Sequence, residues 1–440
     1  MAVFGGLSFI LFGGSASATL LFAWFLTGLA AIACGCLAFL PDFAWRKLTK
    51  GTGLLWVYTL AAVILACFGG NASRSLWIPA SRVTFRMVQL MLTPFFSHIV
   101  AEPAKMILGT ERFSVEIAPE CSGLEGVALM AAFASIWLFL FRKEYRFPQA
   151  FLLVPVSISL IFVANAIRIA ALIAIGDLGA ERIAAGGFHS QAGWIAFNLI
   201  ALGIVAGASR IPWIAADSAR IAQAGRPAEI TTNPTAPFVL PFVVILATGM
   251  LTHAMSADFE WLYPVRFFAA AAALWAFREK YRTLNWRTGW AGPAAGVIVF
   301  GLWLLIEQTG KSAPESMPPS LAAAQIWQRG SWVVFRILAA TVTVPLAEEL
   351  AFRGFLLRRV LSPDFESVSF KRFSWVAIAI SSVLFGLLHG ERWIAGAIAG
   401  LVYALVLVHR GRIGEAVAAH ATTNLLIAAD VLIFHNWQLW

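Results

Sequence analysis

Charged residues are scarce in this sequence: only 12% of its 440 residues are Asp, Glu, Lys or Arg, whereas 60% are hydrophobic. Soluble globular domains carry about 25% charged residues. Half that share over so long a chain predicts a polytopic membrane protein rather than a soluble one. The 32 basic residues outnumber the 23 acidic ones, which gives a net charge of +9. In a membrane protein this excess is typical of cytoplasmic loops, so we predict no nucleic-acid partner.

Cysteine is also rare, with four residues in the chain. Cys34, Cys36 and Cys67 lie in apolar runs, where a thiol packs as a small hydrophobic group, and no disulfide framework is readable. The chain contains no HExxH string, and the CxC at 34–36 lacks histidine partners and zinc spacing. We therefore predict neither a metal nor a cofactor. Cys121 is the exception, because the stretch PECSGLEG surrounds it with polar residues and glycine.

Long apolar runs dominate the sequence instead. A run of about 20 residues crosses a ~30 Å hydrocarbon core, and roughly 12 such spans can be drawn. They lie near 17–40, 52–70, 122–141, 148–175, 190–208, 238–255, 262–277, 291–307, 331–357, 374–390, 392–408 and 413–434. The first apolar run has no basic segment before it, so we expect a retained helix rather than a cleaved signal peptide.

Composition divides these spans into two groups. The segment 209–237 is rich in proline and polar residues, and 308–330 is typical of an extramembrane loop. We predict an all-α polytopic protein with two transmembrane helical domains, 1–210 and 238–440, joined by a cytoplasmic linker at 211–237. Clusters of Lys and Arg occupy 46–50, 142–146, 210–226, 278–287, 358–372 and 410–412. All of them can face the cytoplasm if the amphipathic stretch 83–100 is re-entrant or lies on the outer surface.

That topology places three reactive side chains from separate segments at the non-cytoplasmic side: Cys121, Arg168 and His189. Cysteine attacks as a thiolate, which a helix N-terminus and nearby cations favour, and we expect Cys121 to open the 122–141 helix. His189 can serve as general base and then acid, while Arg168 can hold an oxyanion or a substrate carboxylate. Taken singly, each has a plainer explanation: a packed thiol, an arginine that snorkels to the interface, and a histidine that caps a helix.

The strings PECSG, NAIR and GGFH, in this order, resemble the exosortase/archaeosortase family of membrane cysteine transpeptidases over roughly residues 17–210. The resemblance implies that Cys121 is the nucleophile, that Arg168 and His189 assist it, and that Asn165 supports the site. It also implies cleavage of a C-terminal sorting signal (a short Pro-Glu-type motif, a transmembrane helix and a basic tail) on exported proteins, with transfer to an acceptor.

The second half contains adjacent carboxylates within an apolar helix, in the string AEELAFRGF. Such carboxylates cost several kcal/mol unless they are paired or functional. On a helix Glu349 and Arg353 are i, i+4 neighbours, so we predict that they form an ion pair. Glu348 points about 100° away from them and is free to face other helices.

Two further strings in this half carry histidine. FGLLH places Phe385 four residues before His389, and HATTN places His420 four residues before Asn424, so that the latter pair shares one helix face. At about 1.5 Å of rise per residue, Glu348 and His420 lie roughly 14–15 Å from the cytoplasmic charges, and His389 about 9 Å higher. A buried carboxylate with histidine can activate water for peptide hydrolysis. A zinc site and a polar network that only locks helices together are the alternatives.

These three strings, EExxxR, FxxxH and HxxxN, resemble the CPBP family of intramembrane proteases, related to CAAX prenyl proteases, over about residues 238–435. The resemblance implies that Glu348 activates water with His389, while His420 and Asn424 support the oxyanion. The remaining Glu and Arg complete the first motif. Some members of the family are scaffolds rather than enzymes.

Together the halves resemble the fused type called exosortase E/protease, whose substrates bear a VPEID-type C-terminal signal. We therefore predict a bifunctional processing enzyme of the bacterial inner membrane, with the Cys121 site on the periplasmic side. Its partners are exported proteins with a sorting signal and the lipid bilayer. The alternatives are a transporter, for which no inverted repeat is visible, a polytopic scaffold, and a lipid-linked glycosyltransferase, which lacks its metal-type loop. No motif indicates the acceptor, the second site's substrate or the oligomeric state.

Overall fold

The computed structural model describes residues 2–12, 18–39, 76–216, 233–257, 260–308 and 317–440. It consists of two compact units, Met1–Leu76 and Trp77–Trp440. In the first unit, α1 (Ala2–Phe12) packs against α2 (Ala18–Phe39). The Trp24 indole donates to the Ser8 hydroxyl at 2.8 Å and stacks on Phe4. The predicted span at 52–70 and most of the predicted linker lie outside the described residues.

The second unit begins with a helix and a small sheet. Residues 76–92 are helical, and three short antiparallel strands follow in the order β1 (Val100–Glu102), β2 (Ile107–Gly109) and β3 (Ser114–Glu116). Val88 and Leu108, both fully buried, join the helix and the sheet to one core with Ile173. The stretch predicted at 83–100 as one amphipathic segment is therefore a helix that ends at 92 and a chain that enters a sheet.

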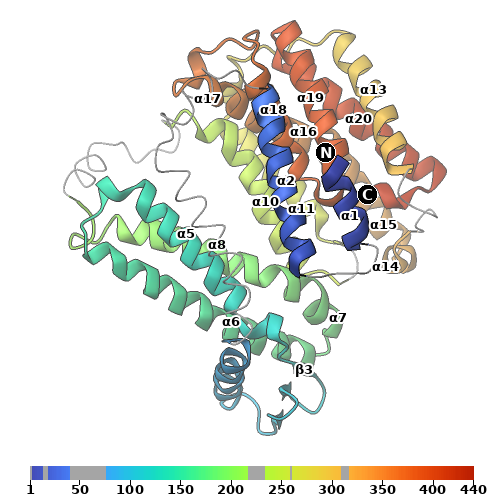
Figure 1. The fold of residues 1–440 in the computed structure, drawn as a ribbon. Helices are drawn as coiled ribbons and strands as arrows, with labels where there is room; N and C mark the ends of the chain where they lie inside the picture. The colour runs from blue at the N-terminus through green and yellow to red at the C-terminus, as the bar shows by residue number, and fades with distance from the viewer. Residues whose placement is uncertain (1, 13–17, 40–75, 217–232, 258–259, 309–316) are drawn as a thin grey trace. The chain divides into compact units, whose positions relative to one another are not determined.

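Three long helices complete the first half of this unit. They are α5 (Leu124–Leu140), α6 (Leu153–Asp177) and α8 (His189–Ala208), and α6 packs against the other two (Figure 1). Short elements connect them: η1 (Pro119–Ser122), η2 (Arg142–Glu144), η3 (Gln149–Leu152), α7 (Glu181–Ile183) and the π-helical turn η4 (Ala184–Phe188). Met130 and Ile161 are buried between these helices, which fixes α5 against α6.

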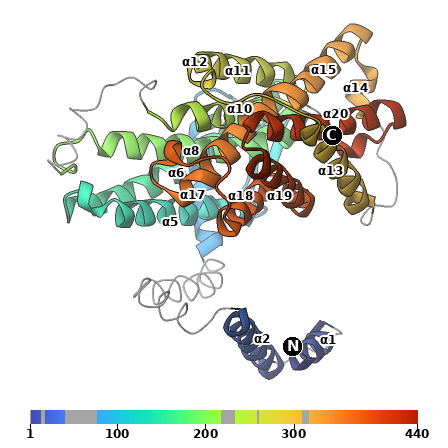
Figure 2. The ribbon, with the colours of Figure 1, turned by 90° about the horizontal axis from the view of Figure 1, so that it is seen from above.

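The second half is a larger helical bundle. Its helices are α10 (Ala236–Ala254), α11 (Tyr263–Ala276), α12 (Arg278–Tyr281), α13 (Ala291–Gln308), α14 (Pro319–Ala323), α18 (Trp375–Leu387), α19 (Trp393–Arg410) and α20 (Ile413–Phe434), with turns η8 (Phe365–Ser367), η9 (Gly390–Arg392) and η10 (Trp437–Leu439). α13 packs along α20, and α18 packs along α19 (Figures 1 and 2). Phe238, Leu350, Phe385 and Tyr403 form the buried centre of this bundle.

One long helix of the bundle, which carries the adjacent glutamates and is called the glutamate helix below, contains two π-helical segments. Residues Ile326–Leu361 run without a break through α15 (Ile326–Leu338), η6 (Ala339–Thr343), α16 (Val344–Glu349), η7 (Leu350–Leu356) and α17 (Leu357–Leu361), and η6 and η7 are π-helical. Pi-helical turns are rare in proteins overall, and those that occur are often found at functional sites. Here they flank the adjacent carboxylates on both sides.

Small residues let α13 approach α20 closely. A Cβ on Gly296 would overlap the carbonyl oxygen of Ala419, so only glycine fits at this contact. Where these two helices begin, the fully buried Glu415 of α20 accepts hydrogen bonds from the N–H groups of Gly289 and Gly292, at 3.0 and 2.8 Å. A carboxylate from α20 thus caps the start of α13.

The described residues contain six helices that are long and apolar enough to cross a membrane, and four shorter apolar helices. The predicted class, an all-α polytopic membrane protein, is confirmed, with the three-stranded sheet as a local addition. The predicted number of spans, roughly 12 from the lengths of the apolar runs, is not confirmed.

Candidate active sites

Cys121 lies in a short turn that precedes a membrane helix. It belongs to η1, and Gly123 separates this turn from α5 with a φ of +87°, a conformation that glycine adopts without strain. The Ser122 carbonyl accepts a hydrogen bond from the Thr84 hydroxyl at 3.1 Å. The helix predicted to start at 122 therefore starts at Leu124, and Cys121 does not open it. The thiol is held by a turn instead of by the first helical residues.

Asn165 of α6 fixes this turn from the other side. Its Nδ2 donates to the carbonyl oxygen of Cys121 at 2.9 Å, and a Cβ on Gly123 would lie only 2.9 Å from the same nitrogen. Arg168 follows on α6 and reaches across to α8, where its Nη1 is 3.0 Å from the position of a Cβ on Gly193. The Arg168 Nε is buried and has no hydrogen-bond partner in the described structure.

His189, the first residue of α8, faces the same cavity as the thiol. This cavity has a volume of about 230 Å³, and Cys121, Ile169, Ala185 and His189 are among its lining residues. Arg168 does not line it. It lines a neighbouring cavity of about 190 Å³ together with Gly123, Asn165 and Ser190. The structure thus brings Cys121 and His189 to one cavity and places Arg168 at the neighbouring one. Gly123 and Ser190, which lie just after Cys121 and His189 in the chain, line that neighbouring cavity.

The adjacent glutamates of α16 have different surroundings, as predicted. Glu349 and Arg353 are both fully buried and form an ion pair, with Arg353 Nε 3.1 Å from Glu349 Oε2, so the predicted pairing is confirmed. Arg353 also donates from Nη2 to the carbonyl oxygen of Gly400 at 2.9 Å, and its Cζ lies 4.3 Å from the centroid of the Phe385 ring. Glu348 lies on a different side and lines a cavity.

His420 connects the two glutamates. Its Nδ1 is 3.1 Å from Oε1 of Glu349, and its Nε2 is 3.9 Å from Oε2 of Glu348. Because Glu349 is paired with Arg353 as a carboxylate, it accepts, and Nδ1 of His420 carries the hydrogen. The second ring nitrogen is thereby directed at Glu348. Stacking on Tyr403, with the two centroids 5.1 Å apart, holds the His420 ring in this orientation.

His389 follows the end of α18 and has a defined hydrogen-bonding role. Its Nδ1 lies 2.9 Å from the carbonyl oxygen of Phe385, which can only accept, so Nδ1 carries the hydrogen and Nε2 of the neutral ring is a base. Asn424 donates from Nδ2 to the carbonyl oxygen of Ala340, inside η6, at 2.8 Å. The π-helical turn thus presents a main-chain carbonyl that orients the amide.

Glu348, His389, His420 and Asn424 all line one cavity of about 210 Å³, called the glutamate cavity below. The depth estimate that put His389 about 9 Å above Glu348 and His420 therefore does not hold. The count of residues from the cytoplasmic charges assumed ideal, upright helices, whereas the glutamate helix contains two π-helical turns and α18 ends just before His389.

Other lining residues were not predicted from the sequence. They include Tyr263, Trp303, Arg336, Tyr403 and Trp440. For Arg336 a signal was available, since an arginine within an apolar helix is by default a functional candidate. The aromatic residues are too common in membrane helices to stand out. Among the residues that the structure describes, no three His, Cys, Asp or Glu side chains are grouped to hold a metal ion.

Two family models match the chain. Residues 2–206 match the family described as transmembrane exosortase (EpsH), and residues 330–426 match the family described as type II CAAX prenyl endopeptidase Rce1-like. Neither a curated protein nor a solved structure matches. The first range contains Cys121, Arg168 and His189, and the second contains Glu348, His389, His420 and Asn424. The predicted combination, an exosortase half followed by a CAAX-protease-like half, is confirmed.

Proposed function

We propose that this fusion of an exosortase half with a Rce1-like half is a bifunctional protein-processing enzyme of the membrane. Its first half is a cysteine transpeptidase that cuts the C-terminal sorting signal of exported proteins. Its second half is a glutamate-type intramembrane endopeptidase that needs no metal. The observation that carries the proposal is that each of the two matched ranges contributes its own set of reactive side chains to a cavity of its own.

In the first site, Cys121 attacks the carbonyl carbon of the scissile peptide bond as a thiolate, after its proton passes to His189. The protonated imidazole then gives that proton to the leaving amine, and a thioester remains on the sulfur. An acceptor amine or water breaks the thioester and restores the thiol. Arg168, in the adjoining cavity, binds the oxyanion or a carboxylate of the sorting motif. Asn165 positions the nucleophile by donating a hydrogen bond to the main-chain carbonyl of Cys121.

In the second site, a water molecule between Glu348 and His389 attacks a peptide carbonyl. Its proton passes to the Glu348 carboxylate or to the unprotonated Nε2 of His389, and then to the leaving amine. The second hydrogen of the Asn424 amide and the Nε2–H of a protonated His420 are donors for the oxyanion. Glu349 and Arg353 do not face the reaction; they set the ring orientation of His420.

The cellular setting belongs to the same proposal. We place the chain in the bacterial inner membrane with the Cys121 site on the periplasmic side, because the basic clusters then face the cytoplasm. The substrates are exported proteins that carry a sorting signal of the VPEID type. The domain limits, 1–210 and 238–440 with a linker at 211–237, stay a prediction.

A co-expressed reporter with a VPEID-type tail tests the proposal. Its intact mass is measured with wild-type protein, Cys121→Ala and Glu348→Gln. We expect Cys121→Ala to leave the tail uncut, and Glu348→Gln to permit this first cut but block a second product. Capture of the reporter on each purified variant separates an enzyme, which keeps binding and loses cleavage, from a scaffold. If all three proteins process the reporter equally, the thiol mechanism is wrong.

A further inference from the structure

The glutamate cavity contains an arginine without a counter-ion. Arg336 of α15 lines this cavity, its Nε is buried without a hydrogen-bond partner, and it forms no ion pair with another described residue. Its Cζ lies 4.4 Å from the ring centroid of Tyr263 and 5.7 Å from that of Trp440. A guanidinium stacked on aromatic rings keeps its N–H donors directed outward in its own plane. The donors of Arg336 are therefore available to an anion.

Arg392, the other arginine that lines this cavity, has partners for its guanidinium group. The Nε of Arg392 is 3.3 Å from Oε2 of Glu307, and its Nη atoms donate to the carbonyl oxygens of Gln438 and Leu439. Within a membrane, an arginine with no such partner is unfavourable and is expected to meet one during function. Arg336 lies on the same continuous helix as Glu348, so an anion bound to it is held beside the reacting groups.

We propose that Arg336 binds a carboxylate of the peptide substrate, either a free C-terminus or an acidic side chain; the identification as substrate rests on the proposed protease function. A carboxylate accepts two parallel N–H bonds from a guanidinium, which fixes both position and direction. Tyr263, Trp303 and Trp440 supply aromatic walls for neighbouring apolar side chains. The preferred ligand is an apolar peptide with one negative charge close to the bond that is cut.

Binding of labelled peptides to full-length Glu348→Gln protein in detergent tests this site without turnover. One apolar sequence is made with a C-terminal acid, with a C-terminal amide, and as an amide with an internal Glu or Gln. We expect at least one acidic peptide to bind about tenfold tighter than its neutral partner, the effect of one charge-assisted contact. The acid and Glu arms tell which carboxylate is recognised.

Substitution of the arginine completes the test. In the Glu348→Gln background, Arg336→Gln abolishes the preference and Arg336→Lys retains part of it, while Arg359→Gln, at an exposed position of the same helix, leaves it unchanged. Equal affinity for acidic and neutral peptides, including no binding of either, overturns the proposal. Absent cleavage by wild-type protein with an intact acid preference counts only against the protease function.

A second, independent observation concerns the turn that carries His189. Gly186 and Gly187 of η4 pack against the end of α10 in the protease half: the Gly187 N–H donates to the carbonyl oxygen of Ser256 at 3.2 Å. A Cβ on Gly187 would overlap the carbonyl oxygen of His253, and one on Gly186 would lie 3.0 Å from that of Ala257. Only glycine fits where Gly187 makes this contact, and His189 lies two residues further along the chain.

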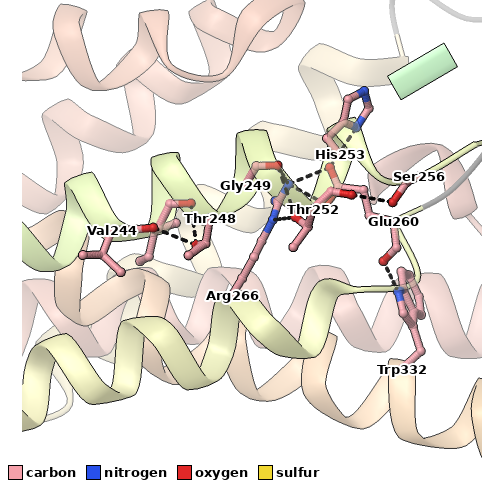
Figure 3. A network of polar contacts seen from close by, with 10 residues as sticks. Val244, Thr248, Gly249, Thr252, His253, Ser256, Glu260, Arg266 and Trp332 are labelled. Atoms are coloured by element: carbon pink, nitrogen blue, oxygen red, sulfur yellow. Dashed lines mark hydrogen bonds and ion pairs between the residues drawn. The ribbon is translucent and has the colours of Figure 1, made fainter. Parts of the chain in front are cut away.

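On the partner side of this contact, a network of polar contacts joins α10 and α11 (Figure 3). Arg266 of α11 donates from Nε to the Thr252 hydroxyl at 3.1 Å, and from Nη2 to the Gly249 carbonyl at 3.0 Å and to Glu260 at 2.6 Å. The Ser256 hydroxyl donates to the Thr252 carbonyl at 2.6 Å. These bonds tie the end of α10 to α11.

The same network reaches the glutamate helix. His253 Nδ1 lies 2.9 Å from Oε1 of Glu260, and the Trp332 indole of α15 donates to the Glu260 carbonyl at 2.8 Å (Figure 3). We infer that the α10–α11 turn of the protease half positions His189 of the exosortase half against Cys121. Gly187 and Arg266 are the positioning residues.

The rate at which iodoacetamide alkylates Cys121 tests this inference without any substrate. The thiolate displaces iodide and forms a thioether. For this assay Cys34, Cys36 and Cys67 of the full-length protein are replaced by Ser, so that Cys121 is the one thiol that can react. We expect Gly187→Ala to slow the reaction about tenfold, toward the rate of His189→Ala, because the thiol loses the base that converts it to the reactive thiolate. Gly203→Ala, in an open position of α8, is the matched control.

Arg266→Gln provides a variant outside the exosortase half, with Arg266→Lys as the rescue. We expect the Gln variant to slow alkylation of Cys121 and the Lys variant to restore part of the rate. If folded Gly187→Ala and Arg266→Gln react as fast as Gly203→Ala, the positioning role is wrong. Alkylation needs neither a sorting signal nor a second cut, so this result is separate from the outcome of the reporter assay.

Discussion

Replacement of Arg353 by Met is expected to destabilise the protein severely, although Arg353 does not line the glutamate cavity. Arg353 and Glu349 are both inaccessible to solvent, and Nε lies 3.1 Å from Oε2. The Met side chain fills a similar volume and keeps contact with the Phe385 ring, but it leaves the Glu349 carboxylate without its cation. His420 Nδ1, at 3.1 Å, then remains as its partner.

The magnitude follows from the fate of the remaining charge. Removing one member of a buried ion pair costs about 3–5 kcal/mol, because the other stays desolvated and uncompensated. Loss of the Nη2 bond to the Gly400 carbonyl adds about 1 kcal/mol. Removing both charges is far milder: the double variant Glu349→Gln/Arg353→Met is expected to lie within about 1–2 kcal/mol of wild type. Its protease activity is nevertheless lost, since the carboxylate that orients His420 is gone.

The free energy of unfolding is measured by SDS titration in mixed detergent micelles, with tryptophan fluorescence as the signal. Arg359→Met, at an exposed position of the same helix, is the control and is expected to change stability by less than about 0.5 kcal/mol. A loss below about 1 kcal/mol for Arg353→Met refutes the reasoning, because it means that the pair is solvated. A double variant as unstable as the single one refutes the assignment of the loss to an uncompensated carboxylate.

Three further predictions follow from single contacts. Asn165→Leu removes the donor to the Cys121 carbonyl and is expected to lower kcat for sorting-signal cleavage about tenfold, with KM and protease activity unchanged, in the reporter assay. Glu415→Gln weakens the carboxylate cap on α13 and is expected to cost about 1–3 kcal/mol in the unfolding titration. Burial raises the pKa of Tyr281, whose hydroxyl donates to a main-chain carbonyl of α10. Because the unfolded chain ionises near pH 10 while the folded one stays neutral, stability falls as pH rises above about 10, and Tyr281→Phe removes this part of the fall.

Local geometry explains what could be predicted. Apolar run length identifies a polytopic membrane protein, because the thickness of the bilayer is fixed. The pairing of Glu349 with Arg353, and the different direction of Glu348, follow from the helical repeat alone. His420 and Asn424 share a face for the same reason. The two family resemblances rest on short strings of adjacent residues, and the family matches confirm them.

Contacts between distant segments were decided only by the tertiary structure. His389 joins Glu348 in one cavity because α18 ends beside the glutamate helix, and no local pattern encodes which helix faces meet. The three-residue strands are too short to show an alternating pattern, so the sheet was missed. Cys121 was expected at a helix start, but Gly123 turns the chain first.

The sequence by itself determined the class of the protein, and it predicted two sets of candidate site residues, because helix geometry and membrane thickness act within a single segment. The tertiary structure decided which segments share a cavity, left Arg336 without a counter-ion, and placed the glycine turn before His189 against the end of α10. These features depend on side-chain packing between helices far apart in the chain, which no run of adjacent residues specifies.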